Sequence, residues 1–135
     1  MSQAKMKDVD YALLANFRAT LRAFTAFSEA KARSMGLTPQ QHQALLTIRG
    51  TATGNATVGY VAERLMLKPH SASGLLSRLE EAGLVIREQD KTDQRKTFLR
   101  LTEEAEQLLE SLSRAHLEEL SNLKPMLISM INQFC

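Results

Sequence analysis

The 135-residue chain, with 44% hydrophobic and 24% charged residues, has the size and composition of one globular domain and is too short for two independent cores. Aromatic residues make up only 5% and tryptophan is absent, which argues against a single-strand nucleic-acid binder built on stacking platforms. The net charge of +2 is weak evidence by itself, but basic residues gather between Arg64 and Arg100, whereas six glutamates lie between Glu103 and Glu119.

The first predicted element is a long helix over about residues 8–34. Its apolar side chains recur at alternating spacings of three and four residues, which predicts one apolar stripe. The stripe consists of Leu14, Phe17, Leu21 and Phe24. Gly36 is predicted to end this helix.

A second helix is predicted to begin at Thr38. Thr38 can cap it, Pro39 suits its first turn, and Gln41 can complete a capping box. Leu45 and Ile48 then fall on its inward face.

A loop over residues 50–57 leads into two short helices joined by a tight turn. The third helix, over about residues 58–66, carries apolar residues at helical spacing, namely Val58, Val61, Ala62 and Leu65. Pro69 fits the first turn of the fourth helix, and Gly83 supplies its stop.

Two short strands are predicted at residues 84–87 and 97–101, joined by a polar run over residues 88–96. A long helix then starts at Thr102 and reaches the region of Ser121.

A last helix is expected over about residues 125–134. It is apolar on nearly every side between residues 126 and 131, and a helix that is apolar all round must be buried. In so short a chain the expected cover is a second copy of the protein.

The fourth helix has an apolar side and a polar side, and its core-facing residues are Ala72, Leu75, Leu76 and Leu79. The polar side suits DNA, because the N-terminus of a helix also favours a phosphate. Gly74 also lies on this side, although glycine inside a helix destabilises it by about 1 kcal/mol relative to alanine. Either the close approach of DNA or drift at an exposed site would explain a glycine here. The residues predicted to contact DNA here are Lys68, His70, Ser71, Ser73, Gly74, Ser77 and Arg78.

The run between the strands is basic, and Arg95 lies at its tip. An arginine on a thin ribbon can enter the narrow minor groove over A·T-rich DNA. Asp93 is expected to hold the Arg95 guanidinium in a forked ion pair, and Arg100 is expected to project from the ribbon as Lys96 does. Taken alone, the polar residues of the helix are more often a solvated first turn, but a basic hairpin beside them favours DNA. An ordinary charged β-turn is the alternative interpretation of the hairpin. The wing residues predicted to contact DNA are Lys91, Asp93, Arg95 and Lys96.

Several short motifs stand at a joint spacing that is more specific than any one of them. They are Leu37-Thr38-Pro39, Val61-Ala62-Glu63-Arg64-Leu65, Pro69, Ser73, Leu75, Arg78-Leu79-Glu80, Gly83-Leu84-Val85, Arg87, Asp93-Gln94-Arg95 and Leu101-Thr102. Together they resemble the MarR family of bacterial winged helix-turn-helix regulators over about residues 37–104.

The resemblance implies a mainly α fold: a winged helix-turn-helix of about six helices with a small β-hairpin wing, forming a homodimer through its terminal helices. Residues 37–102 would form the DNA-binding lobe, and residues 1–36 and 103–135 the dimerisation helices. It implies a sequence-specific regulator, usually a repressor, that binds a pseudo-palindromic operator in double-stranded DNA. A small aromatic or phenolic effector would bind between the dimer helices and the lobe.

The sequence departs from the family pattern at four positions. Met66 replaces the usual glycine of the turn, Lys68 replaces a capping serine, and Gly74 stands where a larger polar residue is common. Ala105 stands where glycine often follows the Leu-Thr pair. These departures bear on base preference rather than on the fold.

No enzyme constellation is found, and neither a cofactor nor a metal is expected. His42, His70 and His116 are far apart and lack a metal-ligand rhythm, so His42 and His116 are expected at helix surfaces or in polar corners. A metal bridging two subunits stays an open alternative. Met35, Met126 and Met130 could line an adaptable apolar pocket, although methionines at helical spacing are more often ordinary core residues.

The lone cysteine, Cys135, excludes an internal disulfide framework and fits a reducing compartment. The chain opens without an apolar signal segment and has no run long enough to span a membrane, so a bacterial cytoplasmic location is expected, at the nucleoid when bound. Two other readings are a winged-helix protein-interaction module without specific DNA binding, and a redox-responsive regulator acting through Cys135.

Overall fold

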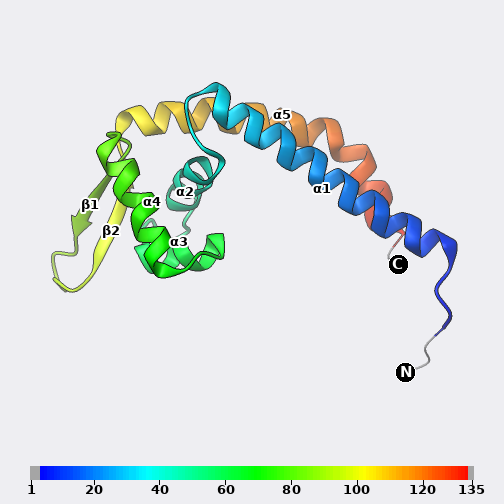
Figure 1. Ribbon diagram of the computed structural model, residues 1–135, viewed down its shortest axis with the longest axis horizontal. Coiled ribbons are helices and arrows are strands. Elements are labelled where there is room, and N and C mark those ends of the chain that lie inside the picture. The colour runs from blue at the N-terminus through cyan, green and yellow to red at the C-terminus, as the bar shows by residue number, and fades with distance from the viewer. Residues whose placement is uncertain (1–3, 134–135) are drawn as a thin grey trace.

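The computed structural model describes residues 4–133 as five helices and one two-stranded antiparallel sheet. The elements are α1 (Asp8–Ser34), α2 (Pro39–Arg49), α3 (Val58–Leu65), α4 (Pro69–Glu81), β1 (Val85–Gln89), β2 (Thr97–Leu101) and α5 (Glu103–Asn132). Figure 1 shows α1 and α5 running side by side as a long arm, with α2, α3, α4 and the hairpin gathered into a lobe at one end. This order of elements is a winged helix-turn-helix, which confirms the predicted fold class.

Threonine caps set where three of the helices begin. The Thr38 hydroxyl accepts a hydrogen bond from the Gln41 backbone N–H at 3.1 Å, and the Gln41 side chain accepts one from the Thr38 N–H at 2.9 Å. This is the predicted capping box. Thr57 caps α3 and Thr102 caps α5 in the same manner.

The core of the lobe is built where α2, α3, α4 and the hairpin meet the start of α5. The predicted inward residues Leu45 and Ile48 are buried, as is the whole predicted apolar side of α4. Leu99 of β2 and Leu112 of α5 complete this core. Buried apolar contacts on one side of α4 therefore fix which side of that helix remains exposed.

The expected break before Pro125 is wrong, because α5 continues as one helix from Glu103 to Asn132, which gives five helices rather than six over residues 4–133. An internal proline loses one backbone hydrogen bond and costs about 3 kcal/mol, but contacts beyond it can offset that cost. Met130 is buried, and the Thr20 hydroxyl of α1 donates to the Met126 sulfur at 3.0 Å. Packing against α1 thus stabilises the part of α5 that follows Pro125.

Much of the apolar surface of the arm is uncovered in the single chain. Three residues of the predicted stripe of α1 are uncovered, because Leu14, Phe17 and Leu21 are 41–53% exposed, whereas the fourth, Phe24, packs against His116 of α5. Ile128 and Ile131 of α5 are about half exposed as well. Over residues 4–133, none of the helices is long and apolar enough to cross a lipid bilayer.

Candidate nucleic-acid interface

The turn between α3 and α4 is closed by a residue in an unusual conformation. Met66 has φ 57° and ψ 41°, the left-handed region, and its side chain is 92% exposed. The Leu67 N–H bonds the Ala62 carbonyl at 2.9 Å, which closes the end of α3. Lys68 stands at the N-cap of α4, and no capping bond from its side chain occurs within the described residues. Met66 therefore adopts the conformation that favours a glycine, and Lys68 does not supply the cap that a serine would.

The polar side of α4 faces solvent as predicted. His70, Ser71, Ser73, Ser77 and Arg78 are exposed, while the opposite side of the helix is buried. The helix therefore presents short donors and acceptors and one guanidinium along a single face, a set able to bond base edges and phosphates.

Gly74 lies in the middle of this face and is half-buried. A Cβ placed on it would meet the Arg78 Nη1 atom at 3.7 Å, an ordinary contact. Within the part of the chain that the structure describes, packing does not require a glycine here.

The hairpin lies beside α4 (Figure 1) and contacts it through β1. Arg87 of β1 forms an ion pair with Glu80 of α4. The strands pair with Val85 opposite Leu101 and Gln89 opposite Thr97, so the wing tip is the segment between Gln89 and Thr97.

The wing tip is ordered by two aspartates. The Asp93 Oδ1 atom accepts from the Arg95 backbone N–H at 3.1 Å and from the Arg95 Nε at 3.2 Å. The predicted ion pair is present, but it uses one carboxylate oxygen and is not forked. The hydrogen bond from the Arg95 side chain, followed by that from its backbone, lowers the pKa of Asp93 below its usual value. Asp90 accepts from the backbone N–H of Thr92 at 3.1 Å.

The cations of the tip remain open to solvent. The Arg95 side chain is 91% exposed, and Lys91 and Lys96 are exposed too. Asp93 therefore orients Arg95 at its Nε side without covering it, and the tip presents three positive charges beside α4.

Arg100 does not project into solvent with these residues, so that expectation is wrong. Its Nη1 donates to the Gly54 carbonyl at 2.8 Å and its Nη2 to the Asn55 Oδ1 at 3.0 Å. The loop that supplies both acceptors lies more than 40 residues away in the sequence, so no local pattern indicates this pairing.

His42 and His116 also differ from expectation, because they are far apart in the sequence yet in contact in the fold. Their ring centroids are 4.9 Å apart. His42, from α2, is only 2% exposed; its burial, and secondly the charge of His116, lower the pKa of His42 below the usual 6.5. Its position three residues before Leu45, on the buried side of α2, was the available signal.

His116 connects three helices. From α5 it approaches the Leu112 carbonyl with Nδ1 at 2.6 Å and the Ser28 hydroxyl of α1 with Nε2 at 2.7 Å. Phe24 and Phe27 of α1 pack edge-on against its ring. Among residues 4–133 there is no group of three His, Cys, Asp or Glu side chains that could hold a metal. Cys135 lies outside the described residues.

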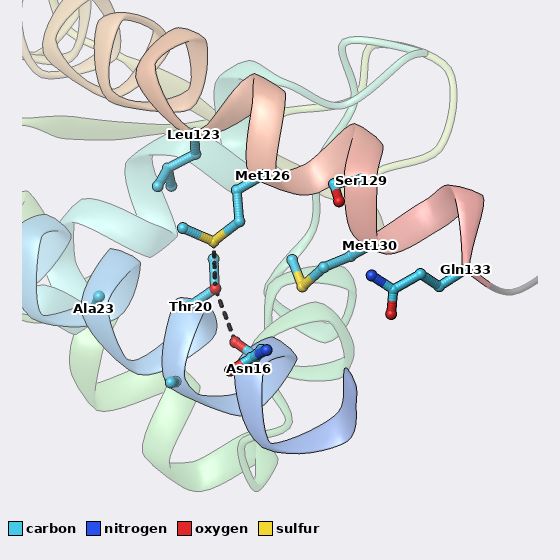
Figure 2. Close-up of a pocket in the computed structure, with 9 residues that line it drawn as sticks. Asn16, Thr20, Ala23, Leu123, Met126, Ser129, Met130 and Gln133 are labelled. Atoms are coloured by element: carbon cyan, nitrogen blue, oxygen red, sulfur yellow. Dashed lines mark hydrogen bonds between the residues drawn. The ribbon is translucent and has the colours of Figure 1, made fainter. Parts of the chain in front are cut away.

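A hollow of about 530 Å³ lies between the outer parts of α1 and α5. Figure 2 shows Met126 and Met130 of α5 facing Asn16 and Thr20 of α1 across it. Two of the three predicted pocket methionines are therefore at one site, whereas Met35 packs on the core of the lobe instead.

Comparison with known proteins relates this geometry to one family. A sequence model of the MarR family matches residues 35–96, from before α2 to the wing tip. The HTH-type transcriptional regulator FarR of Neisseria gonorrhoeae is 49% identical over 47 residues, which cover 35% of this chain and 32% of FarR. The match thus spans about a third of the length of FarR.

Solved structures share the fold over most of the chain. The S. aureus MepR F27L mutant bound to an oligodeoxyribonucleotide has a TM-score of 0.69 at 21% identity, covering 97% of this chain and 100% of MepR. NadR in complex with 4-hydroxyphenylacetate has a TM-score of 0.71 at 26% identity, covering 94% of this chain and 86% of NadR.

Proposed function

We propose that this chain, whose residues 35–96 match the MarR family, is a sequence-specific regulator of transcription that binds double-stranded DNA, and that it acts as a ligand-responsive dimeric repressor. One observation carries the proposal: the exposed polar side of α4 lies beside a basic hairpin whose tip arginine is oriented by Asp93. Residues 37–102 serve as the DNA-binding lobe, and residues 1–36 and 103–135 as the dimerisation helices.

The two halves of the interface have different tasks. On α4, His70, Ser71, Ser73, Ser77 and Arg78 lie in the major groove and bond base edges or phosphates, with Gly74 allowing close approach. On the wing, Arg95 enters the minor groove over A·T-rich DNA, while phosphates are contacted by Lys68, Lys91 and Lys96.

Dimerisation covers the apolar surface of the arm. Leu14, Phe17 and Leu21 of α1 and Ile128 and Ile131 of α5 are large apolar side chains left half exposed on two neighbouring helices. Such a surface favours a partner of the same kind. A twofold pair presents two lobes, whose reading helices fit half-sites about 34 Å apart, one turn of DNA.

A small aromatic or phenolic effector binds where the arm meets the lobe. Phe24 and Phe27 of α1, which pack edge-on against His116 at this joint, are the aromatic side chains nearest to it. NadR, of the same fold, is solved with the phenolic acid 4-hydroxyphenylacetate. The effector releases DNA by binding better to a spacing of the lobes that does not fit the operator.

The test is selection of duplexes from a random library by the purified protein, followed by footprinting of the DNA upstream of its own gene. We expect an inverted repeat with half-sites one turn apart, protected by the protein and released by a phenolic acid such as 4-hydroxyphenylacetate. Binding that follows salt alone and selects no sequence would instead support a winged-helix module that docks on proteins.

A further inference from the structure

The base of the wing is held by two arginines, one from each strand. Arg87 of β1 pairs with Glu80 and so ties the hairpin to α4. Arg100 of β2 reaches the loop between α2 and α3. Because the register places Arg87 opposite Leu99, and Arg100 opposite Ile86, the two arginines stand on opposite faces of the ribbon.

The donors of Arg100 are committed to this contact. Its Nη1 donates to the Gly54 carbonyl at 2.8 Å and to its neighbour's carbonyl, that of Leu99, at 3.2 Å, while its Nη2 donates to Asn55 Oδ1 at 3.0 Å. Its Nε lies 3.8 Å from the Glu88 carboxylate, and its guanidinium packs over the Phe98 ring at 5.6 Å. With three hydrogen bonds to the protein and its side chain only 31% exposed, this guanidinium has fewer donors left for a phosphate than the arginine at the wing tip.

The loop is shaped to receive it. Gly54 has φ +74°, a conformation that L side chains rarely adopt, and its carbonyl accepts from the Arg100 Nη1. The Leu99 N–H bonds the Ala56 carbonyl at 2.8 Å. Strand β2 therefore holds the loop by two contacts, which we call the grip. One joins the Leu99 N–H to the Ala56 carbonyl, and the other joins the Arg100 guanidinium to Gly54 and Asn55.

Small rotations at this grip become large displacements at the wing tip. Arg95 lies five residues from Arg100, and at about 3.3 Å per residue the tip is roughly 16 Å away. A rotation of about 10° at Arg100 would move Arg95 by about 3 Å, half the width of the minor groove, about 6 Å.

We propose that Arg100, held by Gly54 and Asn55, is a positioning residue that sets the direction of the wing and so the entry of Arg95 into the minor groove. This inference rests on the proposed function. Arg100 itself touches no DNA.

The test uses the full chain and a duplex that the wild-type protein selects from a random library, together with the same duplex in which G·C pairs replace the A·T-rich flanks. The variants are Arg100→Gln, Asn55→Ala and Arg95→Ala, alone and combined. Asn55→Ala removes one partner of the grip and changes no charge. Arg114→Gln is the matched control, since it removes an exposed arginine of α5 that pairs with Glu110 on its own helix.

We expect Arg100→Gln and Asn55→Ala each to weaken binding to the A·T-flanked duplex by no more than Arg95→Ala does. Neither should weaken it further once Arg95 is absent, and Arg114→Gln should have no effect. The slope of log affinity against log salt should stay unchanged in both variants, whereas loss of a direct phosphate contact reduces it by about one. An undiminished effect of Arg100→Gln in the Arg95→Ala background, or a reduced slope, would overturn the proposal.

Hydrogen exchange of the Leu99 amide provides a readout that does not depend on DNA. Both variants should speed its exchange while amides in the core of α2 keep their protection, which also shows that the variants fold. Unchanged exchange at Leu99 would overturn the grip. If the wild-type chain selects no duplex, the proposed function fails and this exchange result still decides whether Arg100 holds the loop.

Discussion

The imidazole rings of His42 and His116 lie 4.9 Å apart between centroids, where α2 of the lobe meets α5 of the arm. His42 is buried, and its pKa is lowered by that burial and then by the neighbouring ring. The junction between the two parts of the molecule therefore holds a titratable group in its neutral form.

This buried histidine predicts a pH-dependent stability. Folded His42 stays neutral below 6.5, where the unfolded chain binds a proton, so the unfolded state binds more protons there. The free energy of unfolding should be insensitive to this group above about pH 6.5 and should fall as the pH drops from there toward the lowered pKa. His42→Phe should flatten the fall in urea denaturation between pH 7.5 and 5.5. His70→Gln, at an exposed site, is the control and should keep the wild-type fall in the free energy of unfolding. A fall in His42→Phe as large as that of the wild type would contradict the attribution to His42.

Arg95 and Lys96 should contribute to binding in different ways. Arg95→Ala should weaken binding by about 1–3 kcal/mol, chiefly on duplexes with A·T-rich flanks. Lys96→Ala should weaken binding to all sequences alike and reduce the salt slope by about one. Gel shifts over a salt series measure both, and a wing without a role in binding would leave both variants at wild-type affinity.

The left-handed residue of the turn between α3 and α4 should be a site of easy stabilisation. Met66 has φ 57° and an exposed side chain, and a residue with a Cβ costs about 1 kcal/mol in this region. Met66→Gly should therefore raise the free energy of unfolding, by up to about 1 kcal/mol after the extra entropy of unfolded glycine is subtracted. Met66→Ala keeps the Cβ and should leave the free energy of unfolding unchanged. Equal stability of the two variants in urea denaturation would show that Met66 is not strained.

The uncovered stripe of α1 should set the oligomeric state. Leu21→Glu places a charge in the proposed interface and should convert the dimer to a monomer in sedimentation experiments. Leu46→Glu is a matched control, because Leu46 of α2 is as exposed as Leu21, at 43% against 46%, but lies away from the arm. Equal dimerisation of both variants and the wild type would place the interface elsewhere.

Local patterns were enough to predict most of the lobe. The capping box of Thr38 and the buried side of α4 depend on residues within one or two turns, and the hairpin depends on its own alternation. The break at Pro125 was predicted wrongly because the continuation of α5 depends on contacts with α1, such as that of Met126 with Thr20.

Contacts between segments that are distant in the sequence could not be predicted, because local spacing does not indicate which elements pack together. The pattern alone groups Arg100 with the basic wing residues, because its acceptors on Gly54 and Asn55 come from a loop that α3, α4 and β1 separate from β2 in the sequence. His42 and His116 have no local relationship in the sequence, and only the contact between α2 and α5 brings their rings together. The fork expected between Asp93 and Arg95 became a single-oxygen contact because the same oxygen also accepts from the Arg95 backbone.

His116 belongs to α5, approaches Ser28 of α1 and lies against His42 of α2 with the ring planes tilted by 41°, so one side chain contacts both other helices at the joint. These contacts join the lobe to both helices of the arm. A molecule inserted between the two rings would separate α2 from α5. Because the lobe extends well beyond this joint, its far side would then move by more than the rings themselves.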